Sequence, residues 1–297
     1  MKVLNYGSLN YDYVYAVDHM VSEGETLSSL SMETHLGGKG LNQSIALAKA
    51  GATVYHGGMV GEDGDQLLEA SRSFGVHTDF ITRHPGRSGH AIIQVTQKGE
   101  NGILLYQGAN GKNSEEKIDQ VLSAFGEEDI LLLQNEINLL GSIIDKAYEK
   151  HMKIVLNPSP LNATLLKCDL KKVSLFILNE VEGEQLTGES EPEKILKRME
   201  ILYPASEVVL TLGKQGSIYA GKGKRCRGKS FSVPAVDTTA AGDTYTGYFL
   251  ASVLQGKSIE ESIRTASAAS AIAVTRKGAV PSIPERKEVE AFLNKYL

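Results

Sequence analysis

The sequence predicts an α/β fold in which a central, mostly parallel β-sheet carries helices on both faces. Short apolar segments alternate with helical segments through the second half of the chain. This alternation predicts parallel strands, because a helical connection returns the chain to the same end of the sheet. The 297 residues suit one large α/β domain or two smaller ones. No repeat, low-complexity tract or change of composition marks a linker.

Local patterns predict the elements of the first half. Apolar runs predict strands, helical periodicity predicts helices, and alternating polar residues predict an exposed ribbon. In chain order we expect a strand over residues 3–8, a β-ribbon over 13–32, a helix over 41–50, a strand over 53–58, a helix over 63–74, and a hairpin of 89–95 with 102–106. Gly51 and Gly75 end the two helices, because glycine readily adopts the left-handed conformation of a helix C-terminus.

The second half alternates more regularly. We expect strands over residues 129–133, 153–156, 173–178 and 207–212, and helices over 139–150, 180–186, 193–202 and 258–275. Two or three short β segments follow Gly216, and a further helix begins near Ala241. Ligands of parallel sheets bind beyond the carboxyl ends of the strands. Candidate polar or glycine residues follow predicted strand ends: Asn10, Glu136, Asn157, Asn179 and Gly213.

Composition excludes several classes of protein. Hydrophobic residues make up 41% and charged residues 23% of the chain, which is typical of a soluble globular protein. The formal net charge of −5 leaves no basic footprint for nucleic acid. No apolar run is long enough to span a membrane, the first residues lack the core of a signal peptide, and Cys168 and Cys226 have no metal-ligand spacing. We therefore expect a cytoplasmic protein with no membrane or nucleic-acid partner.

Residues 236–244 hold the leading candidate for a catalytic site. Small residues lead to Gly242 and Asp243, and an apolar helical segment follows at once. A helix that begins near Ala241 would present free backbone N–H groups and a partial positive charge, which attract phosphate. Asp243 would repel that phosphate, so its carboxylate fits the role of a base that takes a proton from an attacking hydroxyl. The alternative is an ordinary aspartate in a first helical turn.

Two stretches of the first half could hold a ligand with hydroxyl groups. Residues 37–42 combine glycines, which allow close approach, with donors on Lys39 and Asn42. The alternative there is a tight turn with a solvated lysine. Asn10 and Asp12 share one face of an extended segment and could bind a polyol or form an exposed Asx turn. Neither nucleotide-binding glycine loop, G-x-x-x-x-G-K-S/T or G-x-G-x-x-G, occurs in the chain.

Two motifs of the second half could serve a nucleotide. Asn179 and Glu182 could form a capping box at a helix start, or could arrange water and magnesium near phosphates. Residues 211–216 form a glycine loop after a strand, which could be the floor of a nucleotide site or an ordinary hairpin. The seven histidines show no metal-ligand spacing, and His90 is expected to be structural or exposed.

Together these motifs resemble the ribokinase (PfkB-type) family of carbohydrate kinases over essentially the whole chain. Residues 7–12 resemble its N-terminal sugar motif, residues 37–42 its first signature and residues 237–243 its highly specific second signature. Residues 108–110 and 273–282 resemble the ribokinase branch more than fructokinases or adenosine kinases.

The resemblance implies a ribokinase-like three-layer α/β/α sandwich formed by one domain, residues 1–297. It also implies a small β-sheet lid, built from about residues 11–36 and 90–106, which would join two copies of the chain into a homodimer. His90 in this lid stands where an apolar residue is common in the family, and it could tune the fit of the substrate.

The resemblance also implies roles for individual residues. Asp243 would be the general base, and the backbone N–H groups of Ala240, Ala241, Gly242 and Asp243 would form an anion hole. The sugar would be held by Asn10, Asp12, Gly38, Lys39, Asn42, Glu136 and Asp243. ATP would contact Asn179, Thr211, Gly213, Gly216, Gly242 and Ser267, although Ser267 stands where some relatives carry His or Asn. Glu182 would serve Mg²⁺ indirectly, and a monovalent cation, usually K⁺, would lie near Asp237, Thr239, Ala273, Arg276, Gly278 and Ser282.

The implied activity is ATP-dependent phosphorylation of the primary hydroxyl of a sugar. The first candidate substrate is D-ribose, with D-ribose 5-phosphate as product. The alternatives are a kinase for another pentose, deoxyribose, a ketohexose or a nucleoside, and a non-catalytic sugar or nucleotide sensor on the same fold. A sensor has no need of a base, so the presence of Asp243 favours an enzyme.

Overall fold

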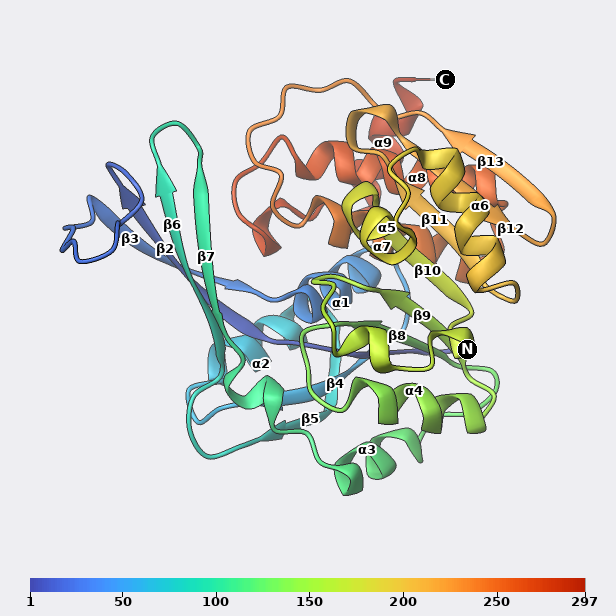
Figure 1. The fold of residues 1–297 in the computed structure, drawn as a ribbon, viewed down its shortest axis with the longest axis horizontal. Coiled ribbons are helices and arrows are strands. Elements are labelled where there is room, and N and C mark those ends of the chain that lie inside the picture. The colour runs from blue at the N-terminus through green and yellow to red at the C-terminus, as the bar shows by residue number, and fades with distance from the viewer. Residues whose placement is uncertain (297) are drawn as a thin grey trace.

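The structure, a computed structural model, describes residues 1–296 and contains a large and a small β-sheet (Figure 1). The large sheet has the strand order β13-β12-β11-β10-β9-β8-β1-β4-β5. Its strands are β1 (Val3–Tyr6), β4 (Val54–Val60), β5 (His77–Arg83), β8 (Ile130–Gln134), β9 (Lys153–Asn157), β10 (Leu175–Asn179), β11 (Glu207–Thr211), β12 (Ser217–Gly221) and β13 (Lys224–Gly228). All neighbours pair in parallel except β11 with β12 and β12 with β13. The predicted, mostly parallel sheet is confirmed.

Helices cover both faces of this sheet. They are α1 (Lys39–Lys49), α2 (Asp65–Ser73), α3 (Glu115–Leu122), α4 (Leu140–Glu149), α5 (Glu180–Thr187), α6 (Pro192–Leu202), α7 (Ala241–Leu254), α8 (Ile259–Ala273) and α9 (Arg286–Asn294). Short 3₁₀ turns occur at Gly108–Gly111, Leu165–Lys167, Leu170–Lys172, Gly213–Gln215 and Val280–Ser282. No helix within residues 1–296 is both long and apolar enough to cross a membrane.

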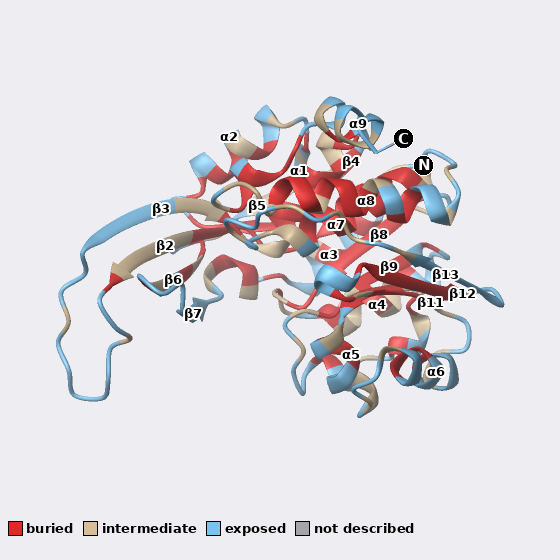
Figure 2. Cartoon of the chain, turned by 90° about the horizontal axis from the view of Figure 1, so that it is seen from above, coloured by how far each residue is buried: buried red, intermediate tan, exposed pale blue. Residues whose placement is uncertain are grey.

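Two hydrophobic cores separate the three layers. Alternate residues of a strand point to opposite faces, so Leu132 of β8 joins the core beneath α1, α7 and α8, whereas Leu131 and Leu133 join the core beneath α3, α4 and α6. Figure 2 shows α1, α7, α8 and α9 on one side of the buried sheet and α5 and α6 on the other. The three-layer α/β/α sandwich is therefore confirmed.

The small sheet has the order β3-β2-β6-β7 and lies at one end of the molecule (Figure 1). Its strands are β2 (Asn10–Val17), β3 (Ser31–Gly37), β6 (Gly89–Thr96) and β7 (Asn101–Tyr106). The hairpin of β6 and β7 is confirmed. The expected β-ribbon over 13–32 is wrong in its middle, because residues 18–30 form no strand. That stretch is largely exposed, and isolated bonds such as that from the N–H of Leu30 to the carbonyl of Ala16 do not extend into a ladder.

Three elements of the fold have no counterpart among the segments expected from sequence. Strand β5 is an edge strand whose exposed His77 and Asp79 weaken the apolar pattern. Helix α3 is capped by Ser114, whose hydroxyl accepts a hydrogen bond from the backbone N–H of Lys117. Helix α9 begins with a capping box between Glu285 and Glu288. Both helices are short, so their start signals had little periodicity to support them.

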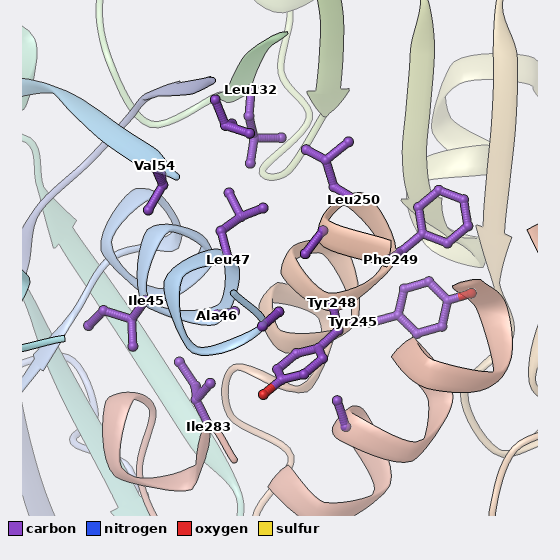
Figure 3. Close-up of a cluster of buried hydrophobic side chains, with 14 of the residues drawn as sticks. Ile45, Ala46, Leu47, Val54, Leu132, Tyr245, Tyr248, Phe249, Leu250 and Ile283 are labelled. Atoms are coloured by element: carbon purple, nitrogen blue, oxygen red, sulfur yellow. The ribbon is translucent and has the colours of Figure 1, made fainter. Parts of the chain in front are cut away.

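Helices α1 and α7 pack unusually closely in the core beneath the sheet. Figure 3 shows Ala46 and Leu47 of α1 facing Tyr248 and Leu250 of α7. A Cβ atom placed on Gly247 of α7 would lie only 2.4 Å from the Cβ of Ala46. The glycine therefore sets the distance between the two helices, since any side chain at this position would separate them.

We predict that Gly247→Ala lowers the free energy of unfolding by about 1–3 kcal/mol, the usual cost of overpacking a filled core. Urea denaturation followed by circular dichroism measures the loss. Gly126→Ala is the matched control, because no atom lies within 4 Å of a Cβ at Gly126. A variant at position 247 as stable as wild type would show that the helices can separate freely.

Candidate functional site

The N-terminus of α7 presents open backbone donors to the surface. Ala240 precedes the helix in the left-handed conformation, with φ of 58°, which costs roughly 1–2 kcal/mol for a residue other than glycine. Within residues 1–296 the N–H groups of Gly242 and Asp243 make no hydrogen bond, and a Cβ at Gly242 would meet no atom within 4 Å. Free donors and the positive end of the helix dipole make this terminus suited to an anion.

The carboxylate of Asp243 lies buried in the first turn of α7 and is held by two amides of α1. The Nδ2 atom of Asn42 donates to Oδ2 of Asp243 at 3.0 Å. The Nε2 atom of Gln43 donates to Oδ1 at 2.8 Å. The Oδ1 atom of Asn42 is buried and has no partner in the described chain, so it could accept a hydrogen bond from a ligand. Sequence reasoning identified Asn42 but missed Gln43.

The start of α1 is fixed by Glu136 and Ser8. The carboxylate of Glu136 accepts from the backbone N–H of Lys39 at 3.0 Å and from the hydroxyl of Ser8. The Ser8 hydroxyl in turn accepts from the backbone N–H of Gly40. A Cβ at Gly40 would lie 2.4 Å from the backbone nitrogen of Ser8, so only glycine allows this approach. These contacts hold Lys39 and Glu136, both predicted to bind the sugar, next to each other.

The charges of the site are closely coupled. Burial lowers the pKa of Lys39, but the nearby carboxylates of Asp243, Glu136 and Glu182 raise it by more, so the ammonium is retained. Burial, together with the charges of Glu136 and Asp243, raises the pKa of Asp12 to about 6. Burial also raises the pKa of Glu136, although Lys39 opposes this. Several carboxylates thus face one ammonium group, a site rich in acceptors for hydroxyl groups.

Residues of the small sheet complete this side of the site. Asn10 begins β2, and its Oδ1 atom accepts from Nδ2 of Asn110 at 2.7 Å. The carboxylate of Asp12 lies against Gly37, where a Cβ would be 2.0 Å from Oδ2. Gly38 adopts a positive φ of 91°, and a Cβ there would lie 3.1 Å from the backbone nitrogen of Asn10. The structure therefore brings the predicted sugar residues of β2 and α1 together.

A cavity of about 430 Å³ lies on the other side of the α7 N-terminus. Five of the six predicted nucleotide residues line it, namely Thr211, Gly213, Gly216, Gly242 and Ser267. Sequence reasoning missed Phe231, Tyr245 and Ser270, which also line it. Ser267, Ser270 and Val274 are three and four residues apart, so they are neighbours on one face of a helix. This spacing could have indicated that Ser270 lines the same site as Ser267. Gly242 connects this cavity to Asp243.

Asn179 is not among the lining residues, and its contacts are those of a capping box. Its side chain accepts from the backbone N–H of Glu182 at 2.9 Å. The carboxylate of Glu182 accepts from the backbone N–H of Asn179 at 3.0 Å and from Nδ2 of Asn179 at 3.1 Å. Both oxygens of Glu182 therefore have one partner, and each can accept a further hydrogen bond, for example from a water ligand of a magnesium ion. The effect of Glu182 on the pKa of Lys39 nevertheless places its charge near the site.

The two segments predicted to hold a monovalent cation lie side by side. Asp237 accepts from the N–H and hydroxyl of Thr239, at 2.9 and 2.6 Å, and from the N–H of Gly278 at 2.8 Å. Burial raises the pKa of Asp237, but these hydrogen bonds lower it by more. The side chains of Arg276 and Ser282 bond elsewhere, to Glu288 and to the carbonyl of Ala279. The carbonyl of Ala273 accepts from the N–H of Arg276.

This geometry agrees with the comparison to known families. The profile of the pfkB family of carbohydrate kinases matches residues 1–286. The chain belongs to the pfkB family of carbohydrate kinases.

Relatives of this carbohydrate kinase share both sequence and fold. Ribokinase of Haemophilus influenzae is 38% identical and aligns over 97% of this chain and 96% of its own length. The crystal structure of ribokinase from Thermotoga maritima has a TM-score of 0.89 at 33% identity and covers 99% of both chains. Ribokinase of Arabidopsis thaliana, whose structure is a complex with ribose and ATP, has a TM-score of 0.87 at 31% identity and covers 98% of both chains.

A buried histidine supports the sugar side of this carbohydrate kinase. His56 of β4 is fully buried; its Nε2 atom lies 3.2 Å from the carbonyl oxygen of Gly7 and its Nδ1 atom 2.8 Å from the hydroxyl of Ser44. A carbonyl can only accept, so Nε2 carries the proton and Nδ1 accepts from Ser44. Burial lowers the pKa of His56 to about 4, so the ring is neutral at physiological pH.

We predict that His56 makes the protein less stable in acid. The unfolded histidine binds a proton below about pH 6.5, whereas folded His56 stays neutral until about pH 4. The free energy of unfolding therefore falls by about 2 kcal/mol from this group between about pH 6.5 and pH 5. The raised pKa of Asp12 acts with the opposite sign, but it is present in wild type and variant alike and cancels in their difference.

Urea denaturation of wild type and His56→Gln across this pH range tests the prediction. The difference in stability between them should shrink by about 2 kcal/mol as the pH falls. His151→Asn is the control, because His151 is exposed and asparagine tolerates its left-handed conformation. A difference that stays constant with pH would contradict the assignment of a neutral buried ring.

Proposed function

We propose that this carbohydrate kinase transfers the terminal phosphoryl group of ATP to the primary hydroxyl of D-ribose, with D-ribose 5-phosphate and ADP as products. One observation carries the proposal: the buried carboxylate of Asp243 lies at the free N-terminus of α7, between the cavity and the cluster around Lys39. A base at the junction of a nucleotide site and a sugar site suits direct phosphoryl transfer. The ribokinase relatives support ribose as the acceptor.

The sugar would lie among donors and acceptors that match its hydroxyl groups. Hydroxyls both donate and accept, so carboxylates, amides and the ammonium group can share them. The residues proposed to hold the sugar are Asn10, Asp12, Gly38, Lys39, Asn42 and Glu136. The unpaired Oδ1 atom of Asn42 supports this role, because a buried acceptor without a partner is costly until a ligand hydroxyl satisfies it.

Asp243 would accept the proton of the primary hydroxyl as its oxygen attacks the terminal phosphorus of ATP. The bond from that phosphorus to the β–γ bridging oxygen breaks, and ADP leaves with the electron pair. The backbone N–H groups from Ala240 to Asp243 would stabilise the negative charge of the transferred group, although that of Ala241 donates to the carbonyl of Thr238 at 3.3 Å in this structure. Phosphoryl transfer depends chiefly on such positioning and charge stabilisation, and a well-placed base contributes roughly 10²–10⁴-fold.

ATP would occupy the cavity lined by Thr211, Gly213, Gly216, Gly242 and Ser267, with Asn179 at its periphery. Mg²⁺ would accompany the phosphates, and Glu182, whose two carboxylate oxygens can each accept a further hydrogen bond, would hold its water ligands. A monovalent cation such as K⁺ would lie between two segments. The first carries Asp237 and Thr239, and the second carries Ala273, Arg276, Gly278 and Ser282. The ordered Asp237 carboxylate fits a cation there. Bound cations of both kinds supply positive charge near the phosphates.

A nucleoside acceptor is less well supported than a sugar. The tyrosine ring of residue 13 packs against His90 with centroids 5.6 Å apart, and His90 packs against Tyr106 at 4.9 Å. Alternate residues of a strand point to opposite faces, so Tyr13 lies on the face of β2 opposite to Asp12. These aromatic rings therefore do not form a platform for a base beside the sugar residues.

Turnover on a panel of acceptors tests the proposed function. With ATP and magnesium, we expect the highest kcat/KM for ribose among ribose, deoxyribose, fructose, adenosine and uridine, and higher activity in potassium than in sodium.

Asp243→Asn should lower kcat by about 10²–10⁴-fold and leave ribose and nucleotide affinity within about threefold. Glu260→Gln, another first-turn acid, is the control and should be fully active. A preference for another acceptor would contradict ribose as the substrate. Full activity of Asp243→Asn would contradict Asp243 as the general base.

We also propose that two copies of the chain associate through the small sheet. The cytoplasmic location expected from the sequence is a separate point and stays a prediction. Met32, Ile92, Leu104 and Tyr106 are exposed on one face of this sheet, Leu104 to 68%. An exposed apolar face of this kind marks a protein interface.

We predict that Leu104→Lys shifts the protein towards monomer, because it places a charge on this apolar face. Sedimentation velocity at micromolar concentration measures the shift. Leu166→Lys is the control, because Leu166 is also exposed, to 52%, but lies on a 3₁₀ turn away from the sheet. Equal effects of the two substitutions, or a wild-type monomer, would contradict the interface.

A further inference from the structure

A row of side-chain amides, buried except for the half-buried Asn157, lies beneath Asp243 and crosses three adjacent strands. Gln134 of β8 donates from Nε2 to Oδ1 of Asn5 on β1 at 2.9 Å and to Oε1 of Gln43 at 2.6 Å. Gln43 of α1 donates from Nε2 to Asp243 at 2.8 Å and to Oδ1 of Asn157 on β9 at 3.3 Å. The row thus connects the carboxyl ends of β1, β8 and β9 to the proposed base.

Backbone carbonyls at both ends fix the direction of every amide in the row. Asn5 donates from Nδ2 to the carbonyl of Gly40 at 2.7 Å, and Asn157 donates from Nδ2 to the carbonyl of Ile177 at 2.9 Å. A carbonyl can only accept, so each of these asparagines must present its own oxygen to the row. Gln134 then has to donate to Asn5 and Gln43, and Gln43 is left with its NH₂ group directed at Asp243.

We propose that Gln43 is a positioning residue that fixes the carboxylate of Asp243 for proton transfer. The inference rests on the proposed role of Asp243 as the base. Gln43 holds Oδ1 while Asn42 holds Oδ2, so the two donors together set the plane of the carboxylate. Each oxygen can accept a further hydrogen bond, which leaves room for the sugar hydroxyl. Without Gln43, the carboxylate is free to turn towards the ammonium group of Lys39, whose pKa its charge already raises.

Gln43→Met keeps the size of the side chain and removes its donor. A displacement of about 1 Å at a reacting group can cost 10²-fold in rate, so we expect kcat for ribose to fall by about 10–100-fold. The KM for ribose and the KM for ATP should stay within about threefold, because Gln43 is proposed to contact neither. General damage to the site would instead raise both KM values and lower the melting temperature.

A double-mutant cycle with Asp243→Asn separates positioning from other roles. If Gln43 acts only through the base, Gln43→Met should have less than about a twofold effect on the residual turnover of Asp243→Asn. Losses that multiply would show that Gln43 acts independently of Asp243, and wild-type kcat in the single variant would overturn the proposal. Failure of the proposed function appears separately, as full activity of Asp243→Asn alone.

Two further variants keep the test sharp. Gln255→Met is the matched control, because Gln255 also donates from α7 to α1, to the carbonyl of Ala50 at 3.0 Å, but at the far end of both helices. It should keep wild-type kcat. Gln134→Met removes the donor that orients Gln43 and leaves Asp243 untouched, so it tests the same proposal if Gln43→Met does not fold. We expect a smaller fall in kcat, about 3–30-fold, again with KM nearly unchanged. An unchanged kcat would contradict the claim that the row of amides orients Gln43.

Discussion

The parallel contact of helix α1 with helix α7 is the constraint on which the rest of the site depends. Three contacts follow one another along it in the same direction: Asn42 with Asp243, Ala46 with Gly247 and, at the residue that follows α7, the carbonyl of Ala50 with Gln255. The members of each helix are one or two turns apart, so the contacts recur on one face. The close approach at Gly247 therefore sets the distance at which the amides of α1 meet the carboxylate of α7.

The same contact explains how opposing charges share a small volume. The first N–H groups of helix α1 donate to Glu136 and Ser8, and helix α7 follows a left-handed Ala240, so each start brings backbone donors towards the point between the helices. The carboxylates there exceed the one ammonium group, Lys39. Burial, together with the neighbouring carboxylates, raises the pKa of Asp12, and burial raises that of Glu136. Such a site is poised to bind hydroxyl groups on one side and phosphate on the other.

Local signals in the sequence were sufficient for the framework of this site. Small residues before an apolar segment predicted the start of α7. The glycines of residues 37–42, expected to let a ligand approach, include Gly40, which the backbone of Ser8 approaches. Long-range partners were not predictable in this way. Gln43 reads as an ordinary polar helix residue, yet its partner Asp243 lies 200 residues away and Gln134 lies 91 residues away. Asn179 shows the reverse case, because its local capping pattern was visible and describes its contacts fully.

The most direct test of Asp243 as the general base is a crystal structure with ribose and a non-hydrolysable ATP analogue. We expect a carboxylate oxygen of Asp243 within about 2.6–3.2 Å of the primary hydroxyl oxygen, the reach of a general base. We also expect that Gln43 still donates to the other carboxylate oxygen and that the terminal phosphate lies against the N–H groups of Gly242 and Asp243. A primary hydroxyl held by another residue, or an Asp243 carboxylate paired with Lys39 and released from Gln43, would contradict this role.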